Sequence, residues 1–570
     1  MTKLKAILLI TSTALFGCTK PPPQDPADIV FLNGGIYTID AERSWAEAAA
    51  IWDGVIIAVG ANADVQPLVG ASTEVFDLAG RMAMPGIHDS HVHPLEGGYE
   101  QVYCNLWNAQ GVDDIVGTLT LCAKHHEGEW FNAVGMDVAV FGVDGPDKDL
   151  LAGIADDKFI FVDDMGGHSA LVNDKVLDLV GYDENTPDPP LGVIERRADS
   201  NEPSGFVREA ARDAIDKLRP ARDLATSKVA MRNALQQMNS YGITSVYDVW
   251  VGEHEMQTYQ ALEQSGELTM RVLGGVTDEG EFERHTGQDF ERVLLGRHNY
   301  ESDLVSYNSV KIFVDGVFEG ETGAVFEPYL TTGELGILNH EPDELKQRVA
   351  HYYDLGMQLH FHTMGDAGTR AALDAIEYAR ERGSEEHKEL RHTLSHLGLI
   401  APEDMPRFRE LNTGASFTMV WGYANSWNTE LNIPAMGKER VDQFYPIRSV
   451  HGAGAVVLGG SDWNYGDLDP LLSIETGITR DNPFGPAQQG ASLLSSSEHV
   501  DLATMIASYT INGAWQLQAE DVSGSIEVGK RADLVVYDRN LFDVDPYAIS
   551  EATVDLTIFD GRIVHRRRSE

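Results

Sequence analysis

The sequence reads Pro85-Gly86-Ile87-His88-Asp89-Ser90-His91-Val92-His93 directly after the apolar segment Met82-Ala83-Met84. On a strand, residues two positions apart face the same side, so His91 and His93 would direct two imidazoles at one point, as a metal chelate requires. A single His-x-His pair is weak evidence for a metal site. The Pro-Gly entry after an apolar segment, however, is the context expected at the end of a first barrel strand.

The middle of the chain alternates helical and extended patterns. In 224–238 apolar residues fall on one helical face, Gly242 ends that helix, and 243–247 reads as a strand. Related patterns return further along the chain, at 345–362, 405–418 and 452–458.

Strands separated by helices form parallel βαβ units. The span 84–520 has room for eight such units, so we predict an α/β fold with a (β/α)₈ TIM-like barrel. A doubly wound open sheet is the alternative architecture. No Gly-x-Gly-x-x-Gly follows an expected strand, which disfavours that alternative.

Both ends of the chain show a different residue pattern, in which short apolar runs are separated by Gly and Asp turns. Asp53-Gly54 separates two such runs near the N-terminus, and Asp560-Gly561 does so near the C-terminus. An Asp-Gly pair between apolar runs is a strong hairpin signal. We therefore expect one small β-sandwich domain built from 28–83 together with 521–570.

The chain of 570 residues carries 43 Lys and Arg against 89 Asp and Glu, a formal net charge of −46. Phosphate binding needs a basic surface, so this balance excludes nucleic acid as a partner. It also disfavours contact between the folded body and anionic lipid. We expect a solvated acidic surface and leave open whether the protein forms a homo-oligomer.

The first residues are typical of an export signal. A basic start is followed by 6–16, an apolar stretch too short to span a membrane. It ends in Leu-Phe-Gly before Cys18, which resembles a bacterial lipoprotein signal whose cysteine becomes the lipidated first residue. We expect a signal peptide over 1–18 and a Pro-rich tether over 19–27. The alternative is an ordinary secretory signal with a chance cysteine.

This signal predicts where the mature protein resides. We expect it at the periplasmic face of a bacterial membrane, preferably the outer one, in contact with lipid only through the anchor on Cys18. Cys104 and Cys122 are the remaining cysteines, and in an oxidising compartment such a pair is a disulfide candidate. Two buried free thiols are the alternative.

Further polar residues stand at or near the ends of expected strands. Polar groups at the ends of apolar strands are costly unless they have partners, and in a barrel the catalytic residues gather at the C-terminal face. With His91 and His93 they offer four imidazoles and a carboxylate, which suit Zn²⁺ or a similar divalent ion. These residues are Lys311, His362, His396 and Asp462.

In this order and context, the site residues resemble those of the amidohydrolase superfamily. The resemblance is strongest to the branch of metal-dependent hydrolases that includes N-substituted formamide deformylases. It covers nearly the whole mature chain, from about Asp28 to Val564. The segments that carry it are 85–93, 310–316, His362 with Gly365-Asp366, 460–463, 509–514 and 524–534.

The resemblance implies a set of ligands for two divalent ions. His360 alternates with His362 and is also a candidate by spacing, but the family pattern favours His362 as the ligand and His360 as a structural residue. The implied ligands are His91, His93 and Asp462 for one ion, and His362 and His396 for the second.

The resemblance also implies that Lys311 is carboxylated by CO₂ and bridges both ions as a carbamate. An ammonium group has no lone pair with which to ligate a cation, whereas a carbamate is an anionic ligand. The two ions, expected to be zinc, would lower the pKa of a bridging water, and Asp462 would pass the proton of that water to the leaving nitrogen. The alternative for Lys311 is a salt bridge, for example with Asp315, and a site with one metal.

A second group of residues is expected near the substrate. His168 lies in a segment that resembles Asp-Gly-His-Ser of the family, with a capping role as the alternative. Trp421 and Tyr423 follow the expected seventh strand and could line the pocket or pack as ordinary loop residues. Met136 and Leu171 stand where the family often has Trp, so the resemblance does not identify a substrate.

We expect the protein to hydrolyse an amide-type, non-peptide C–N bond of a small molecule through a metal-bridged hydroxide. A deaminase, an esterase or a dipeptidase could use the same metal site, because fold alone does not choose among these reactions. An inactive lipid-anchored binding protein is the last alternative. The presence of all the metal-site positions speaks against it.

Overall fold

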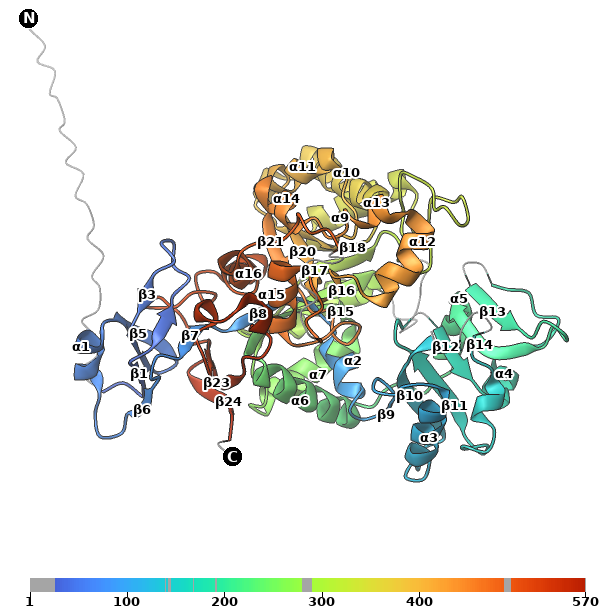
Figure 1. Ribbon diagram of the computed structural model, residues 1–570, viewed down its shortest axis with the longest axis horizontal. Helices are drawn as coiled ribbons and strands as arrows, with labels where there is room; N and C mark the ends of the chain where they lie inside the picture. The colour runs from blue at the N-terminus through green and yellow to red at the C-terminus, as the bar shows by residue number, and fades with distance from the viewer. Residues whose placement is uncertain are drawn as a thin grey trace, which may run out of the picture.

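The computed structural model describes residues 26–138, 140–141, 145–167, 169–189, 192–278, 290–485 and 494–568. Three regions follow one another across Figure 1. A two-sheet region formed by both ends of the chain lies at the left, a barrel lies at the centre, and an inserted sheet domain lies at the right.

Eight strands form the barrel in chain order, and each pairs in parallel with the next. The amide of Asp462, which follows the last strand, donates to the carbonyl of His91 on the first strand at 2.8 Å. This bond joins the two ends of the sheet, so the barrel prediction is confirmed and the open doubly wound sheet was wrong. The strands are β8 (Ile87–Val92), β15 (Ile243–Val251), β16 (Arg271–Asp278), β17 (Val305–Phe313), β18 (Gln358–Thr363), β19 (His392–His396), β20 (Thr413–Phe417) and β21 (Val456–Gly459).

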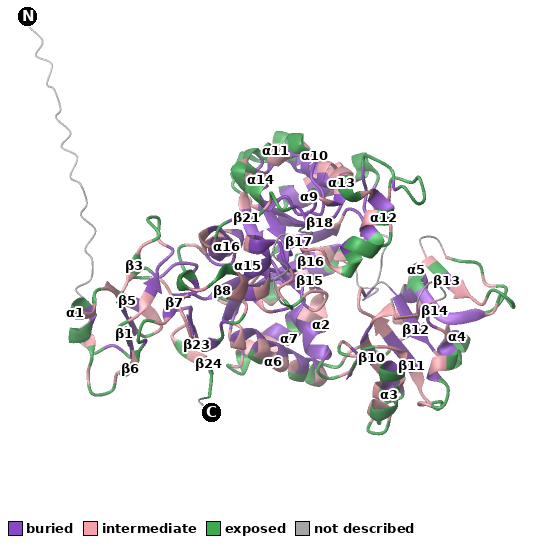
Figure 2. Ribbon diagram, viewed as in Figure 1, coloured by how far each residue is buried: buried purple, intermediate pink, exposed green. Residues whose placement is uncertain are grey.

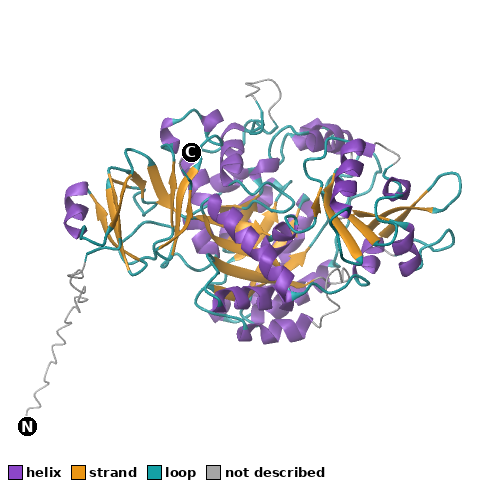
Figure 3. Ribbon diagram, turned by 90° about the horizontal axis from the view of Figure 1, so that it is seen from below, coloured by secondary structure: helices purple, strands orange, loops and turns teal. Residues whose placement is uncertain are grey.

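Helices connect the barrel strands and cover their outer side (Figure 3). In the helix before β15, Met231, Leu235 and Met238 are buried, and Gly242 follows it with φ +82°, a conformation that favours glycine. The helices are α2 (Pro94–Tyr99), α6 (Leu224–Ser240), α7 (Glu253–Gln264), α8 (Phe290–Gly296), α9 (Pro342–Asp354), α10 (Asp366–Arg382), α11 (Met405–Glu410), α12 (Ile433–Met436), α13 (Lys438–Val441), α14 (Ile447–Gly452), α15 (Pro470–Thr479), α16 (Leu502–Ser508) and α17 (Ile511–Gln516).

Burial follows this layering. Figure 2 shows buried residues at the barrel strands and exposed residues on the outward sides of α11 and α14. Within the described ranges, no helix combines the length and the apolar character needed to cross a bilayer.

The two-sheet region is a β-sandwich built from both termini. Leu534 and Val536 face a core shared by the two sheets, whereas Val535 between them joins the core of the barrel, because alternate residues of a strand face opposite sides. One sheet has the order β5 (Val55–Gly60), β4 (Ala48–Trp52), β1 (Ile29–Leu32) and β6 (Glu74–Asp77), with α1 (Asn62–Val65) beside it. The other has the order β24 (Arg562–Arg566), β23 (Val554–Phe559), β22 (Leu534–Tyr537), β7 (Met82–Pro85), β2 (Gly35–Tyr37) and β3 (Trp45–Ala46).

A third region, inserted between β8 and β15, was not separated from the barrel by the sequence analysis. Its mixed sheet carries α3 (Val112–Ala123) on one face and α4 (Asp174–Val180) and α5 (Ala210–Asp216) on the other. The sheet has the order β13 (Gly192–Arg196), β14 (Pro203–Glu209), β12 (Ser169–Val172), β11 (Phe159–Asp164), β10 (Trp130–Met136) and β9 (Cys104–Asn105).

Cys104 on β9 and Cys122 on α3 form a disulfide across a sequence separation of 18 residues. Replacing both cysteines with alanine is expected to lower the free energy of unfolding of the inserted domain by about 3 kcal/mol, because the unfolded loop gains entropy. Denaturant titrations of the two proteins under oxidising conditions measure this difference. A reductant should lower the midpoint of the wild type and leave that of the variant unchanged; an unchanged wild-type midpoint would contradict the prediction.

Candidate functional site

The six residues expected at the metal site line one cavity of about 1130 Å³ at the C-terminal end of the barrel. Each of the six exposes at most 9% of its surface. They come from five different strands or the turns that follow them: His91 and His93 from β8, Lys311 from β17, His362 from β18, His396 from β19, and Asp462 from the turn after β21.

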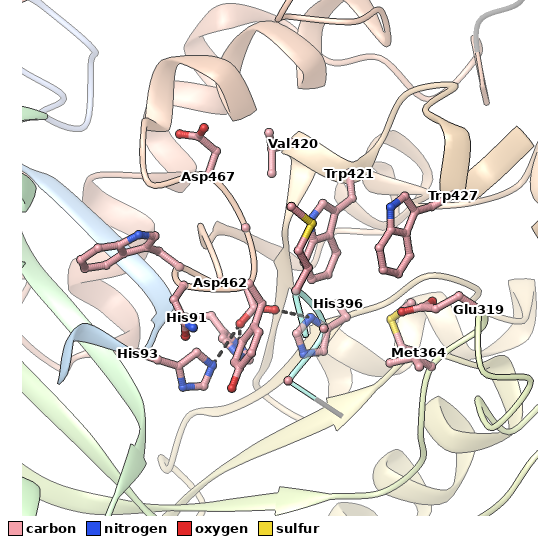
Figure 4. Close-up of a pocket in the computed structure, with 18 of the residues that line it drawn as sticks. His91, His93, Glu319, Met364, His396, Val420, Trp421, Trp427, Asp462 and Asp467 are labelled. Carbon is pink, nitrogen blue, oxygen red and sulfur yellow. Dashed lines mark hydrogen bonds and ion pairs between the residues drawn. The ribbon is translucent and has the colours of Figure 1, made fainter. Parts of the chain in front are cut away.

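Asp462 lies at the centre of this cluster (Figure 4). Its Oδ1 is 3.1 Å from Nε2 of His93 and 3.3 Å from Nε2 of His91, and its Oδ2 is 3.7 Å from Nδ1 of His396. Ligand atoms of His91, His396 and Asp462 all lie within 4.8 Å of one another, which is close enough to share a cation.

Two of these residues have unusual backbone conformations. His396 has φ +71° and Asp462 has φ +54°, in the left-handed region that residues other than glycine rarely adopt. Both occur where a strand ends and the chain turns. Backbone strain of this kind persists only where the surrounding structure holds it, and it is concentrated at functional sites.

The surroundings of Asp462 keep it ionised. Burial by itself would raise the pKa of this carboxyl, but the hydrogen bond with His93 and the nearby ammonium form of Lys311 bring the pKa below its ordinary value. Burial lowers the pKa of Lys311 to about 7, with Asp462 opposing the shift. A substantial fraction of Lys311 is therefore a neutral amine near neutral pH.

The expected alternative for Lys311, a salt bridge with Asp315, is not formed within the described part of the chain. Asp315 instead accepts hydrogen bonds from the amides of Ala324, Met364 and Gly365 at 2.8–3.0 Å. The Nζ atom of Lys311 lies 5.0 Å from the centre of the Phe313 ring.

The histidines of the cluster suit a metal. Burial lowers the pKa of His91, His362 and His396, so these rings are neutral, the form that ligates a cation. The Nδ1 atom of His396 is buried, has no hydrogen-bond partner among the described residues and lies 3.7 Å from Oδ2 of Asp462. Unpaired buried polar atoms are costly, and a bound cation would satisfy them. The donor set therefore fits a divalent metal.

Comparison with known proteins places the chain in a family. The amidohydrolase family model matches residues 74–565. The chain belongs to the amidohydrolase family. As a member of that family it is a metal-dependent hydrolase. It is 26% identical over 556 residues to an N-substituted formamide deformylase of Arthrobacter pascens, covering 95% of this chain and 98% of that protein.

Two further relatives extend over similar lengths. The protein LONG AFTER FAR-RED 3 of Arabidopsis thaliana is 25% identical over 540 residues, which cover 92% of this amidohydrolase and 89% of that protein. An uncharacterized metal-dependent hydrolase from Pyrococcus horikoshii OT3 has a solved structure with a TM-score of 0.73 and 23% identity, covering 91% of this chain and 99% of that chain. It shares the fold.

Two residues that orient candidate ligands in this amidohydrolase were not assigned that role from the sequence. Nε2 of His360 lies 3.0 Å from Nδ1 of His91, so His360 holds the His91 ring with its Nε2 toward Asp462. Oδ1 of Asp315 lies 3.5 Å from Nδ1 of His362. The signal for Asp315 was its position just after a strand, which is where the other polar site residues stand.

The structure describes two of the three residues that were expected near the substrate. Trp421 and Tyr423 line the cavity of the amidohydrolase, and the Trp421 ring stacks 5.8 Å from the ring of His396. His168 lies outside the described residues, as does Cys18. The inserted domain adds a wall that the sequence analysis did not anticipate, which includes Trp107, Gly167 and Val193.

Proposed function

We propose that this amidohydrolase cleaves a non-peptide amide C–N bond of a small molecule with the help of two divalent metal ions. The observation that supports this most is the single buried cluster of four histidines, Lys311 and Asp462 at the C-terminal end of the barrel. The similarity to an N-substituted formamide deformylase favours an amide over an ester or a heterocycle as the bond that is cleaved.

The residues of the cluster would form one set of ligands for each of the two ions. His91, His93 and Asp462 would hold one ion, and His362 and His396 would hold the second. Imidazole and carboxylate ligands suit Zn²⁺. When bound, such ions polarise a carbonyl oxygen and lower the pKa of water.

Lys311 would bridge the ions as a carbamate. Its neutral amine can add to CO₂ and release one proton, which leaves an anionic carboxylate at the end of the side chain. Burial makes the neutral amine accessible near neutral pH, and the absence of a salt bridge to Asp315 within the described part of the chain leaves the amine available for this addition.

Asp462 would move the proton. Its carboxylate is ionised and lies between His93 and His396, so it can take a proton from the attacking water and give it to the leaving nitrogen. The nitrogen then leaves as a neutral amine rather than as an amide anion.

Metal content together with turnover tests the proposal. We expect the mature chain, purified without chelators and with bicarbonate present, to hold about two divalent ions and to release amine from an N-substituted formamide. One ion per chain would favour a mononuclear mechanism and a structural role for Lys311. No ion after reconstitution would contradict the proposed function.

We also propose that the protein is exported and anchored by lipid on Cys18. The basic start, the short apolar stretch and Leu-Phe-Gly before Cys18 support this. Cys18→Ala should move the protein from the membrane fraction to the soluble fraction of the cell envelope on fractionation. A variant that stays with the membrane would contradict the anchor.

A further inference from the structure

Carboxyl groups outnumber Lys and Arg side chains among the residues that line the cavity. Among the described residues that line it, Lys311 is the one Lys or Arg, and it belongs to the metal-site cluster. Three carboxyl groups, those of Glu100, Glu319 and Asp467, line the cavity outside the cluster and its partner Asp315. Outside the described residues, the internal segment 279–289 contains an arginine. The other undescribed internal segments contain no Lys or Arg.

These three carboxyl groups differ in how far they are exposed to solvent. Burial raises the pKa of Glu100 to about 8, so this side chain is largely protonated, and its Oε1 accepts a hydrogen bond from Nε1 of Trp107 at 2.8 Å. Glu319 and Asp467 are exposed to solvent at the cavity wall, although the atoms packed around Asp467 partly bury its carboxyl and raise its pKa. Figure 4 shows them on different sides of the site, with Glu319 beside Met364 and Trp427.

Aromatic rings form part of the cavity wall, and some of them contact the cluster. The Trp250 ring lies 5.8 Å from His93 and 5.4 Å from Phe313, and Trp421 stacks on His396. Aromatic rings offer a large apolar surface that packs against apolar groups. Their faces also carry negative partial charge, which attracts cations. The aromatic residues of the wall are Trp250, Phe313, Trp421, Tyr423, Trp427 and Phe484.

We propose that this cavity accepts amides whose group remote from the scissile bond is aromatic or apolar and either neutral or cationic, and that it excludes amides carrying a carboxylate there. This inference rests on the proposed function. A substrate carboxylate would lose water beside aromatic faces, would find no guanidinium or ammonium group among the described lining residues outside the cluster, and would face Glu319 and Asp467. Amides that carry a carboxylate at the end remote from the scissile bond are therefore outside the substrate class.

Three matched formamides test the charge preference. They are N-benzylformamides with a para methyl, a para aminomethyl or a para carboxylate group, which differ in charge and little in shape. With the metal-loaded full chain, we expect kcat/KM for the carboxylate compound to be at least about 100-fold below that for the methyl compound, and the aminomethyl compound to match or exceed the methyl compound. Equal values for the carboxylate and methyl compounds would overturn the inference.

Binding separates this inference from the proposed function. Calorimetric titration of the same three compounds measures the charge order without requiring turnover. If none is hydrolysed while the neutral and cationic compounds still bind more tightly than the anionic one, the proposed function fails and the charge preference holds. If the three bind equally, or none binds, the charge preference fails.

A charge reversal makes the test sharper. Glu319→Lys should raise kcat/KM for the carboxylate compound about fivefold and lower it for the aminomethyl compound, because it exchanges a repulsive neighbour for an attractive one. Glu334→Lys is the matched control, since Glu334 is exposed and does not line the cavity. Equal effects of the two variants would show that Glu319 does not contribute to the preference for substrate charge, which would contradict the proposal.

Discussion

Asp462→Asn is expected to lower kcat for an amide substrate by about 10³- to 10⁴-fold, because an amide side chain cannot accept the proton of the attacking water. Asparagine keeps the volume of aspartate and can still bond Nε2 of His93, which lies 3.1 Å away in the wild type. The loss should therefore appear in kcat with the barrel intact. Steady-state kinetics and elemental analysis on the same preparation measure turnover and metal content together.

The control for this variant is Asp442→Asn. Asp442 pairs with Lys438 on the surface and does not line the cavity, so its replacement should leave turnover unchanged. If Asp462→Asn retains its metal and turns over within a few fold of the wild type, then Asp462 is not the proton carrier.

The second large effect is expected at Lys311. Lys311→Ala should reduce the metal content from about two ions to one or fewer and lower kcat by about 10³-fold, because the bridging anion is lost. Added acetate or propionate should restore part of the activity, since a carboxylate from solution can take the place of the carbamate in the space left by the lysine side chain. Activity against carboxylate concentration, with metal analysis at each point, measures this rescue.

Lys311→Met separates a bridging role from a structural one. Its side chain fills the space that alanine leaves empty, so no rescue is expected. Wild-type metal content and activity in either variant would contradict the bridge. Equal rescue of both variants would show that the added acid acts elsewhere.

Much of the fold could be predicted from the sequence because the signals are local. The helix, glycine and strand pattern before Ile243–Val251 recurs along the chain, and the turn Asp53-Gly54 joins β4 to β5 as expected. Barrel geometry then brings polar residues at strand ends to one face, which is why His91 and Asp462 meet although they lie far apart in sequence.

The parts that could not be predicted depend on contacts between distant segments. The inserted domain has short strands of mixed direction, and their pairing cannot be inferred from local periodicity. The segment 104–209 was therefore not separated from the barrel. The role of His360 depends on which ring nitrogen of His91 it reaches. The charge of the cavity wall depends on Glu319 and Asp467, which come from loops after different strands.

The pairing of β22 with β7 has a consequence for how the molecule is made. Strand β7 leads through Gly86 directly into β8, which carries His91, and the amide of Gly86 donates to the carbonyl of Asp533 at 2.9 Å. One neighbour of this early strand, β22, is thus made after all the barrel strands, whereas the other neighbour, β2, precedes it in the chain. A nascent chain that stops before residue 534 holds all eight barrel strands but lacks one of the two sheet partners of the strand that leads into His91, so the first barrel strand gains its full support only after β22 has been made.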